Sequence, residues 1–302
     1  MLKNRQTVRM KGNEGGFTLI ELLVVFTIIG LIAALSMPAL KGFGQGNLVN
    51  NVVRQLTDDI SLARSRAISD RCTVYVLFVS TNIYWERNQF QARLNGAAME
   101  LPAIERQRFI QNSRQLWTNL AQQQYTAYAI YASRTVGDQP SQQKPRYLTE
   151  WKSLPDGVMF HPYKLTNNVI INKDDWIKEM KLQRTAGFTN WIEMPLLQMN
   201  CHFPNAKGPE MSMPCIAFNH KGELVFPWLE PGSEKPELLS LPSWCDYEVL
   251  PIVKASGFYE TPGNLVEITP LAALDKPPLM RIRIDGKTGK VTALQDELRE
   301  DF

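Results

Sequence analysis

The chain of 302 residues has few of the side chains from which catalytic and metal sites are usually built. It holds only three histidines and four cysteines. HExxH, GxSxG, Walker-type phosphate loops and CxxC pairs are all missing from the sequence, so no motif supports a metalloprotease, a serine hydrolase, an ATPase or a zinc module. We therefore expect that the protein is not an enzyme, and we expect neither a cofactor nor a resident metal.

An excess of charge is also missing from most of the chain. Four of the 33 basic residues and one of the 30 acidic residues lie in positions 1–16, which leaves 29 of each in the remainder. Segment 295–302 is acidic, which argues against a nucleic-acid partner. The tightest basic group beyond position 16 ends a predicted helix, where the helix dipole accounts for it. Its members are Arg64, Arg66 and Arg71.

One long apolar run is present, between Phe17 and Leu40, and Glu21 is its only charged residue. A helix of this length spans roughly 36 Å, which is enough to cross a bilayer. The basic residues before it keep that end in the cytoplasm, so the rest of the chain lies on the other side. About 260 residues follow, enough for one large domain or for one domain with an insertion.

The small residues that could mark a cleavage site lie before the apolar run instead of after it. An ordinary secretory signal is cut after its apolar segment, whereas here the small residues Gly15 and Gly16 precede it. A cut after Gly16 would remove the leader and keep the helix. Glu21 is costly inside a membrane and is by default functional. It either pairs with a cation from another helix, or it lies about 6 Å along the helix and reaches the headgroups.

The run Gly16-Phe17-Thr18-Leu19-Ile20-Glu21 resembles the processing motif of type IV pilins and type II secretion pseudopilins. The resemblance implies that a prepilin peptidase cuts between Gly16 and Phe17 and methylates Phe17, and that Glu21 guides assembly. Pro38 stands where that family often has a proline. Once the leader is removed, the amine of Phe17 can neutralise Glu21 of a neighbouring subunit that is shifted by one position.

Segment 41–71 is predicted to continue this helix. Three glycines in Gly42–Gly46 predict either a helix break or a soft joint, and Asn47 is a plausible N-cap for an amphipathic helix beyond it. Apolar residues at helical spacing predict a buried stripe lying on a sheet. They are Val49, Val52, Val53, Leu56, Ile60, Ala63 and Ala67. Strand-forming residues 72–79 follow, and a turn at Thr81-Asn82 predicts a hairpin with residues 83–85.

Four segments resemble the GspH/FimT-like group of pilin-like proteins, and their order along the chain strengthens the resemblance. They are 62–68 with 72–74, 154–158, 216–222 and 282–291, of which the last is similar to the closing hairpin of that group. Residues 219–222 and 285–289 are also turns that any antiparallel sheet would use. The resemblance implies an α+β, pilin-like fold, with a long N-terminal hydrophobic helix packed on an antiparallel β-sheet domain.

The chain is longer than this fold requires. We interpret 86–147 as a mostly helical insertion. Within it a helix is predicted to begin near Leu101–Glu105 and to continue to about Tyr131, and a polar surface loop is predicted at 138–145. The insertion is either a surface for a partner or a layer packed on the sheet. Segments 160–215 and 223–262 are interpreted as short strands joined by long loops.

The four cysteines lie, on this interpretation, outside the cytoplasm, where disulfides form. Four cysteines allow three pairings, and the shortest separation favours Cys201 with Cys215. Cys72 begins a predicted strand and is expected to be a buried thiol.

The expected layout is a cleaved leader at 1–16, a membrane and assembly helix at 17–40, its amphipathic continuation at 41–71 and a periplasmic, β-rich domain at 72–302. The resemblance implies a minor pseudopilin of a type II secretion system that passes once through the bacterial inner membrane. Its implied partners are the prepilin peptidase, other pseudopilins or pilins, and the inner-membrane assembly platform. Two alternatives stay open: a minor type IV pilin for adhesion, motility or DNA uptake, and an anchored binding module that never polymerises.

Overall fold

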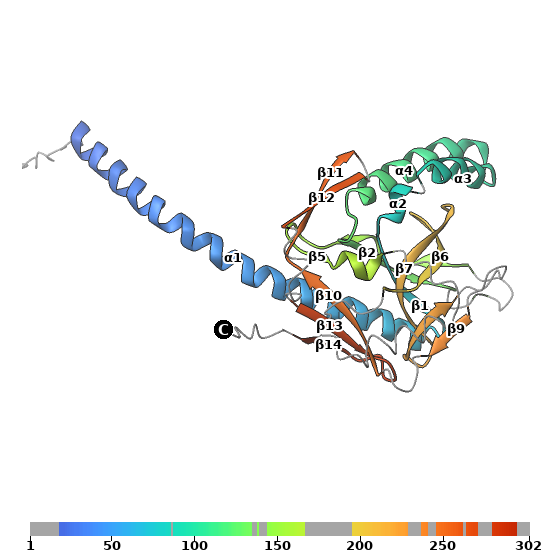
Figure 1. The fold of residues 1–302 in the computed structure, drawn as a ribbon. Helices are drawn as coiled ribbons and strands as arrows, with labels where there is room; N and C mark the ends of the chain where they lie inside the picture. The colour runs from blue at the N-terminus through green and yellow to red at the C-terminus, as the bar shows by residue number, and fades with distance from the viewer. Residues whose placement is uncertain are drawn as a thin grey trace, which may run out of the picture. The chain divides into compact units, whose positions relative to one another are not determined.

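The structure is a computed structural model that describes most of the chain. It covers residues 18–85, 87–134, 138, 144–166, 195–228, 237–240, 246–261, 264–270 and 280–294, with the side chains of 31–49, 82, 85, 228 and 266 outside the description. The chain divides into two compact units, Met1–Val49 and Asn50–Phe302, and each is treated by itself below. The helices are α1 (Leu19–Ser69), α2 (Asn82–Trp85), α3 (Arg87–Met99), α4 (Ala103–Ala121) and the short 3-10 helix η1 (Pro162–Leu165) (Figure 1).

All strand pairs in the described residues are antiparallel, as the α+β prediction requires. The strands are β1 (Val74–Phe78), β2 (Ala127–Ala132), β3 (Arg146–Tyr147), β4 (Lys152–Ser153), β5 (Met159–Phe160), β6 (Gln198–His202), β7 (Glu210–Phe218), β8 (Leu224–Trp228), β9 (Glu237–Ser240), β10 (Tyr247–Val253), β11 (Ser256–Thr261), β12 (Asn264–Thr269), β13 (Met280–Asp285) and β14 (Val291–Leu294). The main sheet has the order β3-β2-β1-β7-β8-β9, with β4 on β2 and β6 on β7. A second sheet has the order β14-β13-β10-β5, and β11 pairs with β12 alone.

The C-terminal part of α1 covers one face of the main sheet, and its predicted stripe is confirmed from residue 52 onward. The buried members are Val52, Val53, Leu56, Ile60, Ala63 and Ala67. Polar groups tie the helix to β2, because the hydroxyl of Tyr128 donates to Asp59 Oδ2 at 2.7 Å and accepts from Gln55 Nε2 at 3.0 Å. Lys152 Nζ, on β4, lies 2.7 Å from Asp59 Oδ1. A buried carboxylate is therefore satisfied by two strands of the sheet.

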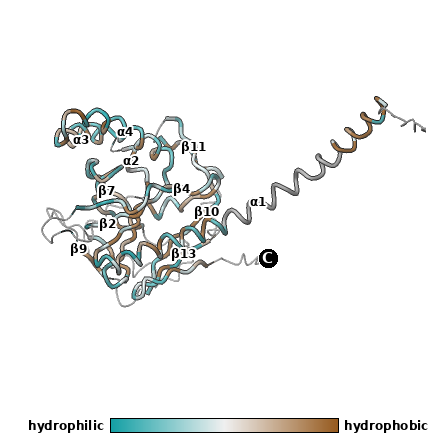
Figure 2. Tube along the Cα trace, turned by 180° about the vertical axis from the view of Figure 1, so that it is seen from behind, coloured by the Kyte–Doolittle hydropathy of each residue, from teal (hydrophilic) through white to brown (hydrophobic). Residues whose placement is uncertain are grey.

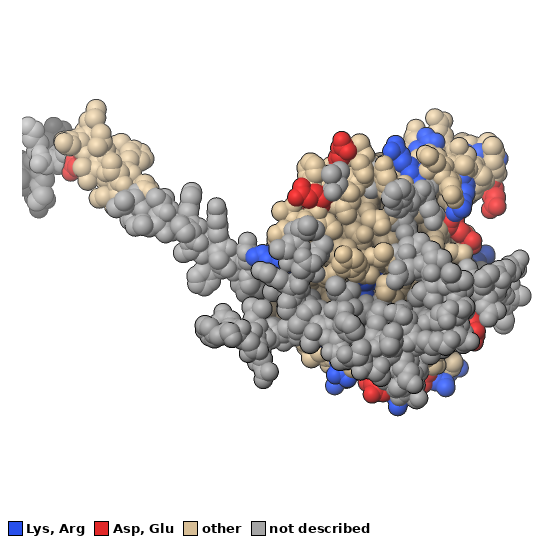
Figure 3. Space-filling model, in the orientation of Figure 1, with Lys and Arg blue, Asp and Glu red and all other residues tan. Residues whose placement is uncertain are grey.

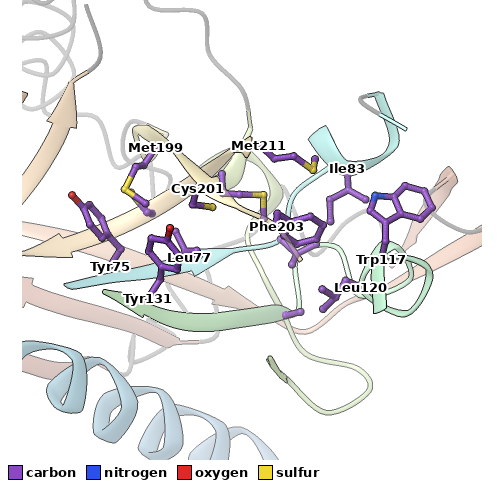
Figure 4. Packing of buried hydrophobic residues seen from close by; sticks show 14 of the residues in the cluster. Tyr75, Leu77, Ile83, Trp117, Leu120, Tyr131, Met199, Cys201, Phe203 and Met211 are labelled. Atoms are coloured by element: carbon purple, nitrogen blue, oxygen red, sulfur yellow. The ribbon is translucent and has the colours of Figure 1, made fainter. Parts of the chain in front are cut away.

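The opposite face of the sheet is covered by α3, α4 and β6. Alternate residues of β1, Tyr75 and Leu77, belong to a buried cluster that includes Trp117 of α4 (Figure 4) and also Phe90 of α3. Phe90 of α3 and Trp117 of α4 stack with their ring centroids 5.7 Å apart, and Phe203, just after β6, meets Phe90 edge-on. The molecule thus has helices on both faces of the main sheet (Figure 1). The insertion packs on the sheet, which is one of the two roles expected for it.

The predicted hairpin after β1 is wrong, because residues 82–85 form α2 and the antiparallel partner of β1 is β2. Leu77 faces Ala129 across the ladder. The start of the predicted insert helix is confirmed within two residues, but α4 ends at Ala121 instead of near Tyr131. Every residue of β2 is buried, so the strand lacks the polar alternation by which a strand is usually recognised. The insertion between β1 and β2 is therefore 79–126, and the predicted range 86–147 wrongly included β2 and β3.

Of the two alternatives predicted for Gly42–Gly46, the helix break is wrong, whereas the soft joint stays a prediction. α1 continues through these glycines, and Asn47 lies inside the helix instead of capping a new one. A glycine costs only about 1 kcal/mol relative to alanine, so helix on both sides outweighs a local preference for a break. The predicted loop at 138–145 lies mostly outside the described residues.

The two predicted turns are confirmed, and both meet the end of α1. Gly222 closes the β7–β8 turn with a φ of 79°, and Gly289 closes the β13–β14 turn with a φ of 62°. A Cβ added to Gly289 would lie 2.1 Å from the carbonyl oxygen of Gly222, and one added to Gly222 would lie 2.7 Å from Ile68 Cδ1. Arg64 Nε donates to the carbonyl of Thr288 at 2.6 Å. We name Arg64, Gly222, Thr288 and Gly289 the Arg64 junction.

The predicted disulfide between Cys201 and Cys215 is not formed, and both residues are free, buried thiols. The residue that faces Cys201 across the ladder is Met211, four positions before Cys215 on β7. Four residues of a strand extend roughly 13 Å, whereas a disulfide requires Cα atoms within about 7 Å. Their short separation in sequence suggested a disulfide, but the register of the β6–β7 hairpin places the two cysteines at different levels of the ladder. Cys72 is a buried free thiol, as expected, and Cys245 lies outside the described residues.

Candidate processing and assembly site

Thr18 and Glu21 form a capping box at the start of α1. The carbonyl of Thr18 accepts from the amide of Leu22 at 3.2 Å, which makes Thr18 the N-cap. The amide of Glu21 donates to Thr18 Oγ1 at 3.3 Å, and the amide of Thr18 donates to Glu21 Oε2 at 3.2 Å. The hydroxyl of Thr18 also donates to Oε2, at 3.1 Å. These reciprocal bonds satisfy free amides of the first turn and place a carboxylate at the positive end of the helix dipole.

Glu21 accepts these bonds through one carboxylate oxygen. Both donors lie on Thr18 and both reach Oε2. Among the residues that the structure describes, no lysine or arginine forms an ion pair with Glu21. A carboxylate offers about four acceptor positions on its two oxygens, so the group still has capacity for a cation that approaches from outside the helix.

The first turns of α1, around Glu21, are largely hydrophobic (Figure 2). Their large apolar side chains are exposed within this unit, as Leu19 at 85 % and Phe26 at 65 % show. The others are Ile20, Leu22, Leu23, Val24, Val25, Ile28 and Ile29. Apolar surface of this extent marks a site of contact with protein or lipid.

Three of the predicted site residues lie outside this description. Gly16 and Phe17 are not among the described residues, and for Pro38 only the backbone is described, as part of α1. Over the described residues, no helix combines the length and the apolar character that a membrane crossing needs.

Thr18 belongs to this site, although the sequence analysis named only Glu21. The spacing Thr-x-x-Glu immediately before an apolar run is a sequence signature of a capping box. The signal was therefore present in the sequence. The cost of a carboxylate within an apolar run directed attention to Glu21 alone.

Other ionisable side chains are dispersed over the second unit. His161 is buried before η1, His202 Nδ1 lies 2.8 Å from the carbonyl oxygen of Gly208, and His220 is exposed in the β7–β8 turn. Burial raises the pKa of the Cys201 and Cys215 thiols, so both stay protonated and unreactive. Within the described part of the chain, no three His, Cys, Asp or Glu side chains are arranged to hold a metal ion.

One buried ion pair lies beneath β10. Lys164 of η1 pairs with Glu248, and Glu248 Oε1 also accepts from the amide of Val249 at 2.9 Å. Both side chains are more than nine-tenths buried. The pair joins η1 to the second sheet and requires no ligand to neutralise it.

Comparison with known proteins identifies the N-terminal segment. The family described as the prokaryotic N-terminal methylation motif matches residues 11–37, which include Gly16, Phe17 and Glu21. No curated protein and no solved structure matches the chain. The N-terminal segment is therefore that of a type IV prepilin-like protein, and the motif implies processing by prepilin peptidase and assembly with other pilins.

Proposed function

We propose that the chain is a minor pseudopilin of a type II secretion system. Prepilin peptidase would cut between Gly16 and Phe17 and methylate Phe17, and the mature subunit would join a pseudopilus through α1. The observation that carries this proposal is the capping box of Thr18 and Glu21 at the head of an exposed apolar helix, within the matched motif.

The chemistry of Glu21 supports an assembly step. In the single subunit the Thr18 hydroxyl and amide hold the carboxylate at the helix start. The methylated amine of Phe17 in a neighbouring subunit is a cation that can approach this carboxylate when two helices stack with a shift of one subunit. Pairing the two charges removes most of the cost of placing each of them in lipid.

The Arg64 junction supports the GspH/FimT-like placement within the pilin-like proteins. Three of the segments on which that resemblance rests meet there, namely 62–68, 216–222 and 282–291. Each of these segments alone is weak support for the resemblance. Their contact with one another in the fold makes that support stronger.

The layer of α3 and α4 supports a minor subunit over a major one. It adds a helical pair to the sheet face opposite α1, and such bulk would crowd a densely repeated shaft. We place the helix in the inner membrane and the second unit in the periplasm, and we assign no catalytic role to the chain.

A deletion of the gene, complemented with wild type or with Glu21→Val, tests this role against the alternatives. We expect exoproteins to accumulate in the periplasm of the deletion strain while pili and motility persist, and we expect Glu21→Val not to restore secretion. Glu150→Gln, which changes an exposed glutamate elsewhere, should restore it fully. Loss of pili, motility or DNA uptake with normal secretion would identify a minor pilin instead. If all these properties are unchanged, the protein is an anchored module.

A further inference from the structure

A groove lies between α3 and the β6–β7 hairpin, on the side of the main sheet that α1 does not cover. Its volume is about 1070 Å³, and its lining includes Arg93, Glu100, Lys144, His202, Lys207 and Glu210. We name it the insert groove. One wall belongs to the helical insertion and the other to the hairpin, so both elements that thicken this face of the domain contribute to it.

The insert groove and the two helices beside it concentrate positive charge in a chain that is otherwise balanced. Among the described residues of α3, α4 and the groove, seven side chains are basic and three are acidic. The basic ones are Arg87, Arg93, Arg106, Arg108, Arg114, Lys144 and Lys207, and the acidic ones are Glu100, Glu105 and Glu210. Lysine and arginine side chains gather over α3 and α4 in Figure 3. A local field of this kind attracts an acidic partner.

Apolar side chains stand at one end of this basic surface. Met99, which ends α3, is 67 % exposed, and Ile104, in the first turn of α4, is 91 % exposed. Leu101, in the turn between the two helices, lines the groove. Methionine and arginine are among the residue types enriched at protein interfaces, and an exposed apolar side chain such as Ile104 can be buried there by a partner.

The position of the groove in the fold suits a partner in an assembled filament. α1 packs on one face of the sheet, and the cluster that contains Phe90 and Trp117 packs on the other. On the proposed function, subunits stack through α1. The part of α1 that belongs to the same unit as the groove packs on the opposite face of the sheet, so it does not cover the insert groove.

We propose that the insert groove docks an acidic protein segment of a neighbouring filament component, with an apolar side chain of that segment seated on Met99 and Ile104. A nucleic acid fits this surface less well. The aromatic side chains of α3 and α4, Phe90, Phe109 and Trp117, pack into the core and offer no face on which a base could stack.

Site-specific photo-cross-linking of the full-length protein in its own cells tests this proposal. A benzoylphenylalanine replaces Ile104, and in a control strain it replaces Tyr163, which is 58 % exposed and lies outside the groove. We expect Ile104 to cross-link to a peptide of net negative charge, identified by mass spectrometry, and Tyr163 not to do so. Lys144→Glu with Lys207→Glu should lower the yield about ten-fold, whereas Lys221→Glu with Lys287→Glu, at exposed turn positions, should leave it unchanged.

The cross-linking results can overturn the proposed docking site in several ways. A cross-link to a neutral or basic peptide, a cross-link to nucleic acid, or a yield that ignores the charge reversal overturns the proposal, as does the absence of any cross-link. The thermal unfolding of each variant is compared with that of wild type, so that misfolding is not taken for lost docking. Leader removal and incorporation into filaments are measured in the same cells. Normal assembly without an acidic cross-link overturns the insert groove alone, whereas failed assembly overturns the proposed function.

Discussion

Arg64 Nε donates to the carbonyl oxygen of Thr288 at 2.6 Å, across 224 positions of sequence. The contact fastens the end of α1 to the closing β13–β14 hairpin. Gly289, next to Thr288, leaves no space for a side chain between Arg64 and the carbonyl of Gly222. One arginine and two glycines thus set how the helix meets both sheets of the domain.

Gly289→Ala should destabilise the domain more than Gly157→Ala does. Both glycines have a positive φ, of 62° and 87°, so either alanine has a backbone cost of about 1–2 kcal/mol. Only at Gly289 would the new Cβ also lie 2.1 Å from a backbone oxygen, since nothing lies within 4 Å at Gly157. We expect an additional loss of about 2 kcal/mol in the free energy of unfolding. Urea denaturation of the full-length protein in detergent measures it, and equal losses would contradict the crowding described here.

Thr288→Val should reduce stability at neutral pH and less so in acid. The hydroxyl and amide of Thr288 both donate to Asp285 Oδ1 at 2.7 Å, and these bonds lower the pKa of Asp285 below its usual value. A carboxyl whose pKa is lower in the folded state stabilises the fold above its unfolded pKa of about 3.9 and loses that contribution as the pH falls through the folded pKa. The difference in unfolding free energy between variant and wild type should therefore shrink between pH 6 and pH 2.

Thr292→Val is the matched control for this titration. The Thr292 hydroxyl donates to the carbonyl of Arg283 at 3.4 Å and to no carboxylate. Its effect should be the same at both pH values. If the two variants show the same pH dependence, the bonds to Asp285 do not cause the shift.

Tyr128→Phe should cost about 2 kcal/mol of stability, because it removes a hydrogen bond to a buried carboxylate. Asp59 is 7 % exposed and depends on Tyr128 and Lys152. Lys152→Met should cost less, about 1 kcal/mol or below, because its side chain is 38 % exposed and the pair is partly screened by solvent. Tyr163→Phe, at an exposed tyrosine, should change little. A double-mutant cycle of Tyr128→Phe and Asp59→Ala should show coupling above 0.5 kcal/mol, and additive losses would argue against the bond.

Cys201 and Cys215 should react with iodoacetamide only after unfolding. Both thiols are buried and free, and burial raises the pKa of each. Peptide mapping of native and denatured samples, without reductant, measures the labelling of each cysteine. Full labelling of both in the denatured sample is the expected result. A peptide pair that resists labelling until it is reduced would restore the disulfide that sequence proximity favoured.

Local patterns predicted the elements whose signal lies within one segment. The stripe from Val52 to Ala67 gave the buried face of α1, and the glycines at 222 and 289 gave the two turns. β2 escaped prediction because it is buried on both faces and its partner β1 lies about 50 residues earlier, across three helices. A strand whose neighbours are distant in sequence has no local sign of its pairing.

The residues of the candidate site and of the other functional features also fall into those that local sequence could predict and those that it could not. Glu21 was recognisable because a single carboxylate in an apolar run needs a reason, and Thr18 could have been recognised from its spacing to Glu21. The Arg64 junction and the insert groove could not, because each joins segments that only the folded chain brings together. The sequence suggested that Arg64 interacts with the dipole of its own helix, whereas its Nε donates a hydrogen bond to the carbonyl of Thr288 in the β13–β14 hairpin.

The mass of the mature N-terminus tests the central claim most directly. The protein is extracted from membranes of cells that carry prepilin peptidase and of cells that lack it, and its N-terminal peptide is sequenced by mass spectrometry. We predict a chain that begins at N-methylated Phe17 in the first case and keeps residues 1–16 in the second. A leader that stays attached in both, or a cut beyond Leu40 that removes Glu21, would contradict it.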